Sequence, residues 1–175
     1  GAVMKVGQGG GVAIGRVLLV SGLAVVLLGC PERVDCLRCG PFAPVGSFGS
    51  PEIVECSGLA ASRDNPGILW THNDSGDTAR LFAVQEDGTL RGTYVLGGPA
   101  EAVDWEDMAL GPCAGGGTAP CLYVGDIGDN ESVRSQVQVY RVAEPVIPPP
   151  SGEAVFQVLE DVVRFDVVYP DGPRD

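Results

Sequence analysis

The sequence predicts an all-β fold for most of its 175 residues, and three observations lead to this. Glycine and proline are frequent, at 26 and 14 residues, and follow no short period, which is typical of a turn-rich β protein. The apolar runs are short and separated by turn signals. After the apolar N-terminal segment, no stretch repeats apolar residues at helical spacing. A chain of this length can bury one hydrophobic core.

The composition is acidic. The formal net charge is -12, and no cluster of lysine or arginine interrupts the negative field. Such a field disfavours nucleic acid and anionic lipid headgroups as partners, because both carry negative charge themselves. The same field attracts divalent cations, so the composition favours them as ligands.

The N-terminus has the layout of a secretory signal peptide. Lys5 and Arg16 form the positive flank, and residues 17–28 form an apolar core of 12 residues (28 − 17 + 1). This core is too short to span a bilayer as a helix. We therefore expect residues 1–29 to be a cleaved signal peptide with a helical core. Its removal leaves 9 basic residues (11 − 2) against 23 acidic ones, a net charge of -14.

A cysteine ends this segment. Leu27-Leu28-Gly29-Cys30 resembles the lipobox of bacterial lipoproteins. The resemblance implies that Cys30 is acylated with fatty acids such as palmitate, and that it becomes the mature N-terminus. The chain would then be lipid-anchored in the bacterial cell envelope, at the outer membrane or cell surface, with the membrane as a partner. A signal peptide that merely contains a cysteine, or a short uncleaved anchor, remains an alternative.

Five cysteines remain after Cys30, and in an exported protein disulfides are their default state. Cys113 and Cys121 flank a glycine-rich loop that can bring two strand ends together, so we expect them to pair. Cys36 and Cys39 have zinc-knuckle or redox spacing, but no second pair or nearby histidine completes such a site. We expect one of these two to bond Cys56.

Residues 30–51 are rich in proline, glycine and serine, and we expect a flexible tether there. A run of short predicted strands follows. Asp87-Gly88 lies between the third and fourth of them and is a strong hairpin signal. The first four predicted strands are Ser57–Ser62, Gly67–His72, Arg80–Val84 and Leu90–Leu96.

A second group of four strands repeats this order. Leu59 and Met108 occupy equivalent places 49 residues apart (108 − 59), and Leu69 and Leu122 are 53 apart (122 − 69). The second four predicted strands are Asp104–Leu110, Cys121–Ile127, Val137–Val142 and Val162–Tyr169.

Four strands repeated at a spacing near fifty residues are the signature of a β-propeller blade, a four-stranded antiparallel sheet. We expect residues 52–175 to form a propeller fragment, with blade one over 53–98 and blade two over 103–169. A closed propeller needs at least about four blades. We therefore expect an incomplete propeller, which is either truncated or dependent on partners to cover its open edges.

Two motifs carry a resemblance to a family. The acidic segments "DWEDMAL" (104–110) and "LYVGDIGDN" (122–130), in this order of strands, are similar to secreted bacterial β-propeller lipoproteins. These are loosely related to phytase-like and six-bladed, TolB-like propellers, and the resemblance covers about residues 53–175. It implies an exported propeller, but it implies no activity.

Acidic turns provide the candidate site. A D-x-G-D pattern follows the second strand of each predicted blade, where propeller loops crowd one end of the central channel. Carboxylates gathered there repel one another unless a proton or cation neutralises them, and Ca²⁺ prefers such oxygen ligands. The candidate ligands are Asp74, Asp77, Asp104, Glu106, Asp107, Asp126 and Asp129.

Simpler interpretations stay open for each of these residues. Asp side chains also cap turns by accepting backbone hydrogen bonds, and a turn can be repeated only because a blade is repeated. His72, the one histidine, is a candidate base or ligand, or else a hydrogen-bonded residue at the blade rim. Trp105 can stack on a sugar or aromatic ligand, or pack between blades.

Two functions are consistent with the sequence. The first is an exported, lipid-anchored β-propeller module that binds a ligand or protein partner, with Ca²⁺ as its candidate cofactor. The second is a metal-dependent hydrolase of phosphoesters or lactones that uses an acidic propeller funnel. The chain has no G-x-S-x-G elbow, no P-loop and no dinucleotide fingerprint after a strand. Whether the protein is an enzyme is left undecided by the sequence.

Overall fold

The computed structural model describes residues 43–115 and 117–173, together with two short strands near the N-terminus. The chain divides into two compact units, residues 1–43 and 44–175. The described residues contain strands and no helix, so the predicted all-β fold is confirmed for them. Accordingly, none of these residues belongs to a helix with the length and apolar character needed to cross a membrane.

The apolar N-terminal segment forms strands. β1 (Val17–Val20) and β2 (Leu23–Val26) pair antiparallel. The helix predicted for residues 17–28 is therefore wrong where the structure describes them. Two physical reasons favour strands: valine is β-branched and packs well in sheets, and so short a helix is marginal in water. Cys30 and the tether up to residue 42 lie outside the described residues.

The first sheet of the larger unit has five strands in the order β10-β6-β5-β4-β3. Four of these strands form an antiparallel meander close to the predicted positions. Their bounds are β3 (Cys56–Ala61), β4 (Ile68–Asn73), β5 (Arg80–Gln85) and β6 (Leu90–Leu96).

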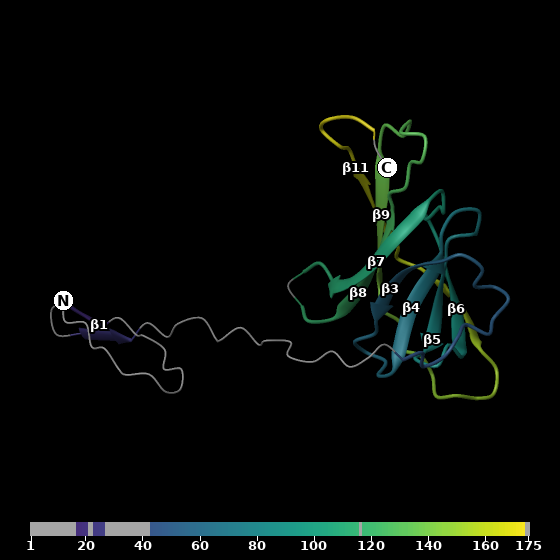
Figure 1. The fold of residues 1–175 in the computed structure, drawn as a ribbon, viewed down its shortest axis with the longest axis horizontal. Helices are drawn as coiled ribbons and strands as arrows, with labels where there is room; N and C mark the ends of the chain where they lie inside the picture. Colours follow the sequence, from purple (N-terminus) through teal and green to yellow (C-terminus); the bar gives the residue numbers. More distant parts are fainter. Residues whose placement is uncertain (1–16, 21–22, 27–42, 116, 174–175) are drawn as a thin grey trace. The chain divides into compact units, whose positions relative to one another are not determined.

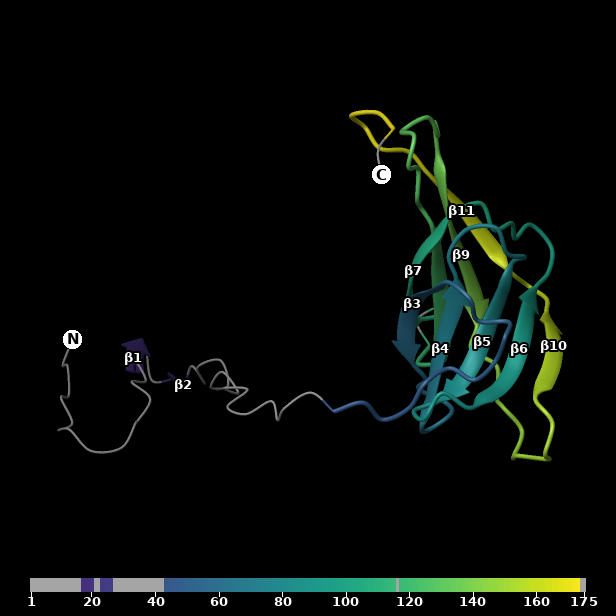
Figure 2. The same cartoon turned by 45° about the vertical axis from the view of Figure 1, so that its right-hand side comes forward.

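The fifth strand corrects the prediction of four-stranded antiparallel sheets. β10 (Val155–Leu159) pairs parallel with β6, so the chain returns to the first sheet before completing the second (Figure 2). The segment follows three consecutive prolines, Pro148–Pro150, and sequence analysis missed it. Parallel pairing needs a long crossover rather than a tight turn, and no local turn signal marks it.

The second sheet has four antiparallel strands in the order β11-β9-β8-β7. All four coincide with predicted strands to within a few residues. Their bounds are β7 (Trp105–Pro112), β8 (Pro120–Asp126), β9 (Val137–Ala143) and β11 (Val163–Val167).

The two sheets share one hydrophobic core, with β3 beside β7 (Figure 1). Trp70 of β4 and Tyr94 of β6 meet edge to face, with ring centroids 5.1 Å apart. Trp105 of β7 lies 6.1 Å from Tyr140 of β9. Aromatic rings of this size dominate core energetics, and these four are at most 1% exposed.

The strand register carries the same irregularity in both sheets. Between β3 and β4 the pairing jumps from Ser57 to Leu59, which leaves Gly58 as a bulge with φ of 55°. Between β7 and β8 it jumps from Trp105 to Asp107, which leaves Glu106 as a bulge. A bulge re-aims the side chain that it carries. The internal repeat inferred from strand spacing therefore extends to the bulge near the start of each first strand.

The predicted disulfide is present. Cys113 and Cys121 are bonded across the β7–β8 connection, with Cα atoms 5.1 Å apart. Cys56 is instead an exposed free thiol, 2.9 Å from Thr71 Oγ1. The bond expected from Cys36 or Cys39 to Cys56 is therefore not formed, and those two cysteines lie outside the described residues.

Candidate metal site

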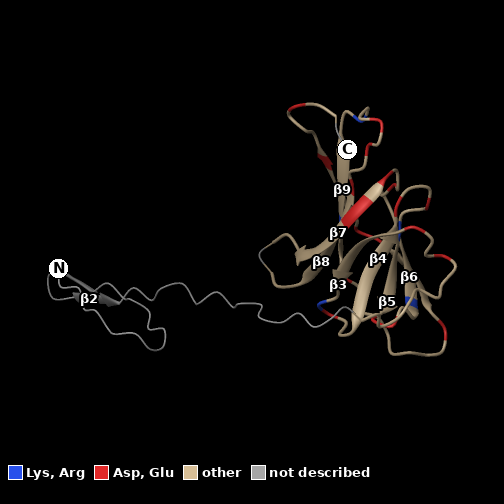
Figure 3. Ribbon diagram, in the orientation of Figure 1, with Lys and Arg blue, Asp and Glu red and all other residues tan. Residues whose placement is uncertain are grey.

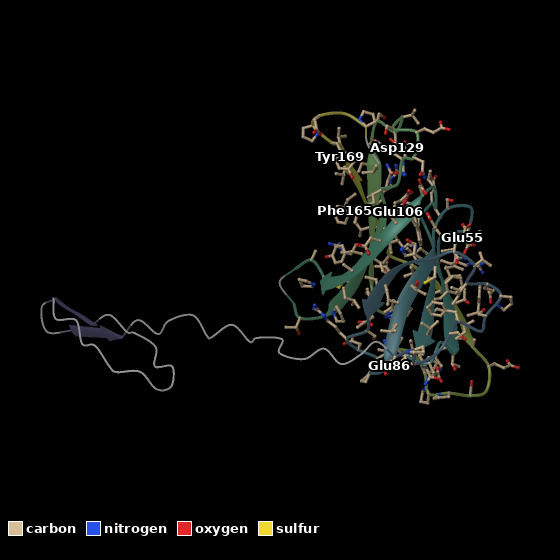
Figure 4. The ribbon with its side chains drawn as sticks, in the orientation of Figure 1. Glu55, Glu86, Glu106, Asp129, Phe165 and Tyr169 are labelled. Carbon is tan, nitrogen blue, oxygen red and sulfur yellow. A yellow bond between two sulfur atoms is a disulfide. The ribbon has the colours of Figure 1, made fainter. Side chains whose placement is uncertain are left out.

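Three of the seven predicted acidic ligands converge. Asp74 follows β4 of the first sheet, whereas Asp104 precedes β7 and Glu106 is the bulged second residue of β7. One carboxylate oxygen from each lies within 4.8 Å of the others. A β-bridge between Ser75 and Asp104 holds the two chain segments together. The acidic start of β7 is red in Figure 3, and Figure 4 labels Glu106 there.

The turn after β8 encloses this cluster. A Cβ built on Gly128 would lie 2.5 Å from both Asp104 Oδ2 and Glu106 Oε1, so a larger residue there would have to displace the two carboxylates. Gly128 N donates to the Asp104 carbonyl at 3.1 Å, and Asn130 Nδ2 donates to Asp104 Oδ2 at 3.2 Å. The "GDIGDN" motif thus shapes the site through Gly128 and Asn130. The sequence analysis did not assign these two residues to the site.

The electrostatics of the cluster favour a cation. Asp74 Oδ1 is buried, and it has no hydrogen-bond partner among the described residues. A buried carboxylate oxygen without a donor is costly. Three carboxylates this close also repel one another at low dielectric. A hard cation such as Ca²⁺ would offset both effects, because it binds carboxylate and carbonyl oxygens.

Asp77 has a different set of partners. Its carboxylate accepts hydrogen bonds from Asn73 Nδ2 at 2.6 Å, Thr78 N at 2.7 Å and Arg80 Nε at 2.9 Å. Burial raises the pKa of Asp77, but the hydrogen bonds from Arg80, Thr78 and Asn73 outweigh it and hold that pKa below its usual value. These contacts match the turn-capping interpretation.

The carboxylates after β8 also have local donors, except at one oxygen: Asp126 Oδ2 is buried and has no hydrogen-bond partner among the described residues. Asp129 accepts hydrogen bonds from Val133 N at 2.9 Å and Arg134 N at 2.8 Å. Asp126 Oδ1 accepts one from Asp104 N at 3.0 Å and pairs with Arg134 at 2.8 Å. The structure therefore places these two acids in turn and ion-pair roles.

Asp107 is also held locally. Its Oδ1 accepts a hydrogen bond from the neighbouring Met108 N at 2.7 Å. Asp107 is not one of the three converging carboxylates, and its charge, like that of Asp74, raises the pKa of His72.

The repeat explains part of this pattern. Asn73 and Asp126 end the second strand of each sheet, and each accepts a backbone N–H from the segment before its first strand. Glu55 N donates to Asn73 Oδ1 at 3.3 Å, as Asp104 N does to Asp126 Oδ1 at 3.0 Å. This shared bond follows from the repeated sheet. Among the described residues the three-carboxylate cluster occurs once, because it forms where the two sheets meet.

His72 is buried and does not face solvent. It is 0% exposed, its Nδ1 donates to the Asn73 carbonyl at 2.8 Å, and its ring meets Trp105 edge to face at 5.5 Å. Burial lowers its pKa and outweighs the Asn73 carbonyl and the Asp107 and Asp74 charges, which raise it. His72 is therefore a neutral residue near neutral pH. It is hydrogen-bonded, as the simpler interpretation expected, but it lies in the core rather than at the rim.

Trp105 is a core residue too. It is 1% exposed, and its Nε1 donates to the Glu101 carbonyl at 2.8 Å. These contacts match the packing interpretation of this tryptophan and leave no open ring face for a ligand to stack on.

Comparison with known proteins returned no family model, no curated protein and no solved structure that matches this chain.

Proposed function

We propose that this chain is an exported, lipid-anchored binding module of the bacterial cell envelope that holds a Ca²⁺-type cation where its two sheets meet. In this proposal the two sheets are blades of a β-propeller, and the cation orders the loops that meet a ligand or protein partner. The observation that carries the proposal is the convergence of Asp74, from the first sheet, with Asp104 and Glu106, at the start of the second.

The chemistry of the donors supports Ca²⁺ over a softer metal. All three side chains offer oxygen, and neither a thiol nor an imidazole belongs to the group. Zinc prefers sulfur and nitrogen ligands in tetrahedral sites. Ca²⁺ accepts six to eight oxygens in flexible geometry, with backbone carbonyls and water completing its shell. The net charge of -12 adds long-range attraction for any cation.

A binding role has more support than hydrolysis. A hydrolase needs a base positioned beside an open water site. His72 is 0% exposed, and its ring packs against Trp105, so it offers no base to a substrate. Of the remaining candidates, Asp77 accepts hydrogen bonds from Thr78 N and the Arg80 guanidinium. Asp129 accepts them from the backbone N–H groups of Val133 and Arg134.

Calorimetric titration with Ca²⁺ tests the site. We expect the wild-type chain to release or absorb heat at a single site, and Asp74→Asn and Glu106→Gln to lose that heat. Asp64→Asn and Glu153→Gln are the matched controls, because both residues are exposed and lie outside the cluster. Equal heats in all variants would remove the cation from the proposal.

The anchor is tested by fractionation. Cys30→Ser abolishes the acylated residue, and we expect this variant to leave the membrane fraction and become soluble. A single acyl chain gives only marginal binding, and stable anchoring needs more than one. Unchanged membrane association of Cys30→Ser would contradict the lipid anchor while leaving the cation site untouched.

A further inference from the structure

β11 is an edge strand with one unpaired side. It pairs antiparallel with β9 and is the terminal strand of its sheet, so among the described residues no strand covers its outer edge (Figure 1). An edge of this kind presents a row of backbone donors and acceptors that can pair with another strand. It follows that β11 is a place where the sheet can be extended.

One face of β11 is an exposed apolar stripe. Val163, Phe165 and Val167 alternate along the strand and are 36%, 40% and 39% exposed. The Arg141 guanidinium lies over the Phe165 ring, 5.4 Å from its centroid. Phe165 is labelled on this outer strand in Figure 4. Contiguous apolar side chains of this kind on a sheet edge mark interaction surfaces.

The other face of β11 carries one positive and one negative charge. Arg164 Nε lies 2.8 Å from Asp166 Oδ1, and the two side chains are 30% and 50% exposed. Gln138 Nε2 of β9 also donates to Asp166 Oδ1, at 3.2 Å. Both charged groups are thus held on the sheet surface but remain accessible to a neighbouring strand.

The sequence of β11, Val-Arg-Phe-Asp-Val, is complementary to itself when one copy is reversed. Centred on Phe165, antiparallel pairing places Arg164 of one copy opposite Asp166 of the other, twice by symmetry. It also places valine opposite valine and Phe165 opposite Phe165. Opposite-charge and aromatic cross-strand pairs stabilise a sheet. Parallel pairing in register would instead place like charges opposite each other.

We propose that β11 pairs antiparallel with β11 of a second copy of this chain, giving a two-fold symmetric dimer with one sheet running through both copies. Such an interface is isologous, because the same strand serves both sides. Because the interface is small, we expect a weak, reversible association with a Kd of roughly micromolar or above. The proposal does not depend on the cation site.

Charge exchange along β11 tests this dimer by sedimentation of the full chain in detergent. We expect the wild type to show reversible dimers. Arg164→Asp and Asp166→Arg each turn both attractive pairs into repulsive ones, so each should weaken the dimer at least about tenfold. The double variant Arg164→Asp/Asp166→Arg restores complementarity and should dimerise like the wild type.

Mixing the two single variants is the most specific test of the pairing. Two acids on one copy then face two arginines on the other, so we expect a heterodimer although neither variant dimerises alone. Circular dichroism of each variant confirms that the sheets are intact. A monomeric wild type, or the same association in every variant, would overturn the proposal. The same association in every variant would show that the chains associate through another part of the protein, such as residues 1–42, which all variants share.

Discussion

The indole Nε1 of Trp70 donates a 2.8 Å hydrogen bond to Oε1 of Glu144 and so joins the two sheets inside the protein. Trp70 belongs to β4 of the first sheet, and Glu144 directly follows β9 of the second. The Glu144 carboxylate also accepts bonds from the Ser62 hydroxyl, from Asn65 Nδ2 and from two backbone N–H groups of the β3–β4 loop. Glu144 is 7% exposed, so its charge is met by protein donors rather than by water.

Glu144→Ala should destabilise the protein by about 3 kcal/mol, because it leaves the buried Trp70 indole N–H and two part-buried backbone N–H groups without their acceptor. Urea unfolding measures this change. Glu153→Ala is the control: it removes an exposed carboxylate and should stay within about 0.5 kcal/mol of wild type. Equal stability of the two variants would show that the carboxylate does not hold the sheets together.

The pKa of His72 makes stability depend on pH. Burial lowers this pKa from its usual value of 6.5, so the folded state holds the neutral ring and the unfolded state protonates first. The neutral His72 ring therefore makes its full contribution to the free energy of unfolding above pH 6.5. As the pH falls below that value, the free energy of unfolding decreases by at most about 1.4 kcal/mol per pH unit. Unfolding free energies between about pH 7.5 and 5.5 measure the slope. His72→Gln should flatten it, and an unchanged slope would assign the effect to other groups.

Asp77 should matter for stability and not for cation binding. Asp77→Ala removes the acceptor for Thr78 N and the partner of Arg80, at a cost of about 1–2 kcal/mol. Its Ca²⁺ heat should match that of the wild type, in contrast to Asp74→Asn. If Asp77→Ala abolished the heat of Ca²⁺ binding while remaining folded, Asp77 would belong to the cation site, contrary to this prediction.

Gly128 should control the shape of the site. A methyl group there lies 2.5 Å from both Asp104 Oδ2 and Glu106 Oε1, so Gly128→Ala must push the carboxylates apart. We expect it to weaken Ca²⁺ binding at least about tenfold, since the ligand atoms lose their shared geometry. Gly49→Ala is the matched control, because a Cβ on Gly49 meets nothing within 4 Å. Wild-type affinity in Gly128→Ala would contradict the site.

The Cys113–Cys121 bond should stabilise the protein by constraining its unfolded chain. The two cysteines are 8 residues apart, and a loop of that size predicts a loss of about 2–3 kcal/mol for the double Cys→Ala variant. The difference in thermal unfolding between the variant and the wild type checks this value. The wild type under reducing conditions should approach the variant, and a variant as stable as the oxidised wild type would count against it.

Local patterns predicted most of the fold. The strand positions of β3 to β9 and β11 follow from short apolar runs bounded by turn residues, and the β5–β6 hairpin follows from Asp87-Gly88. β10 was missed because its partner β6 is distant in sequence and parallel to it. The strands near the N-terminus were missed because an apolar run of that length suits a helix or a strand equally well.

By itself, the sequence determined the all-β class, the repeated order of strands and the acidic residues that follow the second strand of each sheet. These features depend on short apolar runs and turn residues, which act over a few neighbouring positions. Only the tertiary structure decided which acids meet. Packing of β3 beside β7 and the Ser75–Asp104 bridge bring Asp74 to Asp104 and Glu106. Local N–H groups and Arg80 and Arg134 hold Asp77, Asp126 and Asp129 instead. The physical reason is that a carboxylate binds the donors nearest to it in the folded chain. The separation of two residues along the sequence does not determine how close they lie in space.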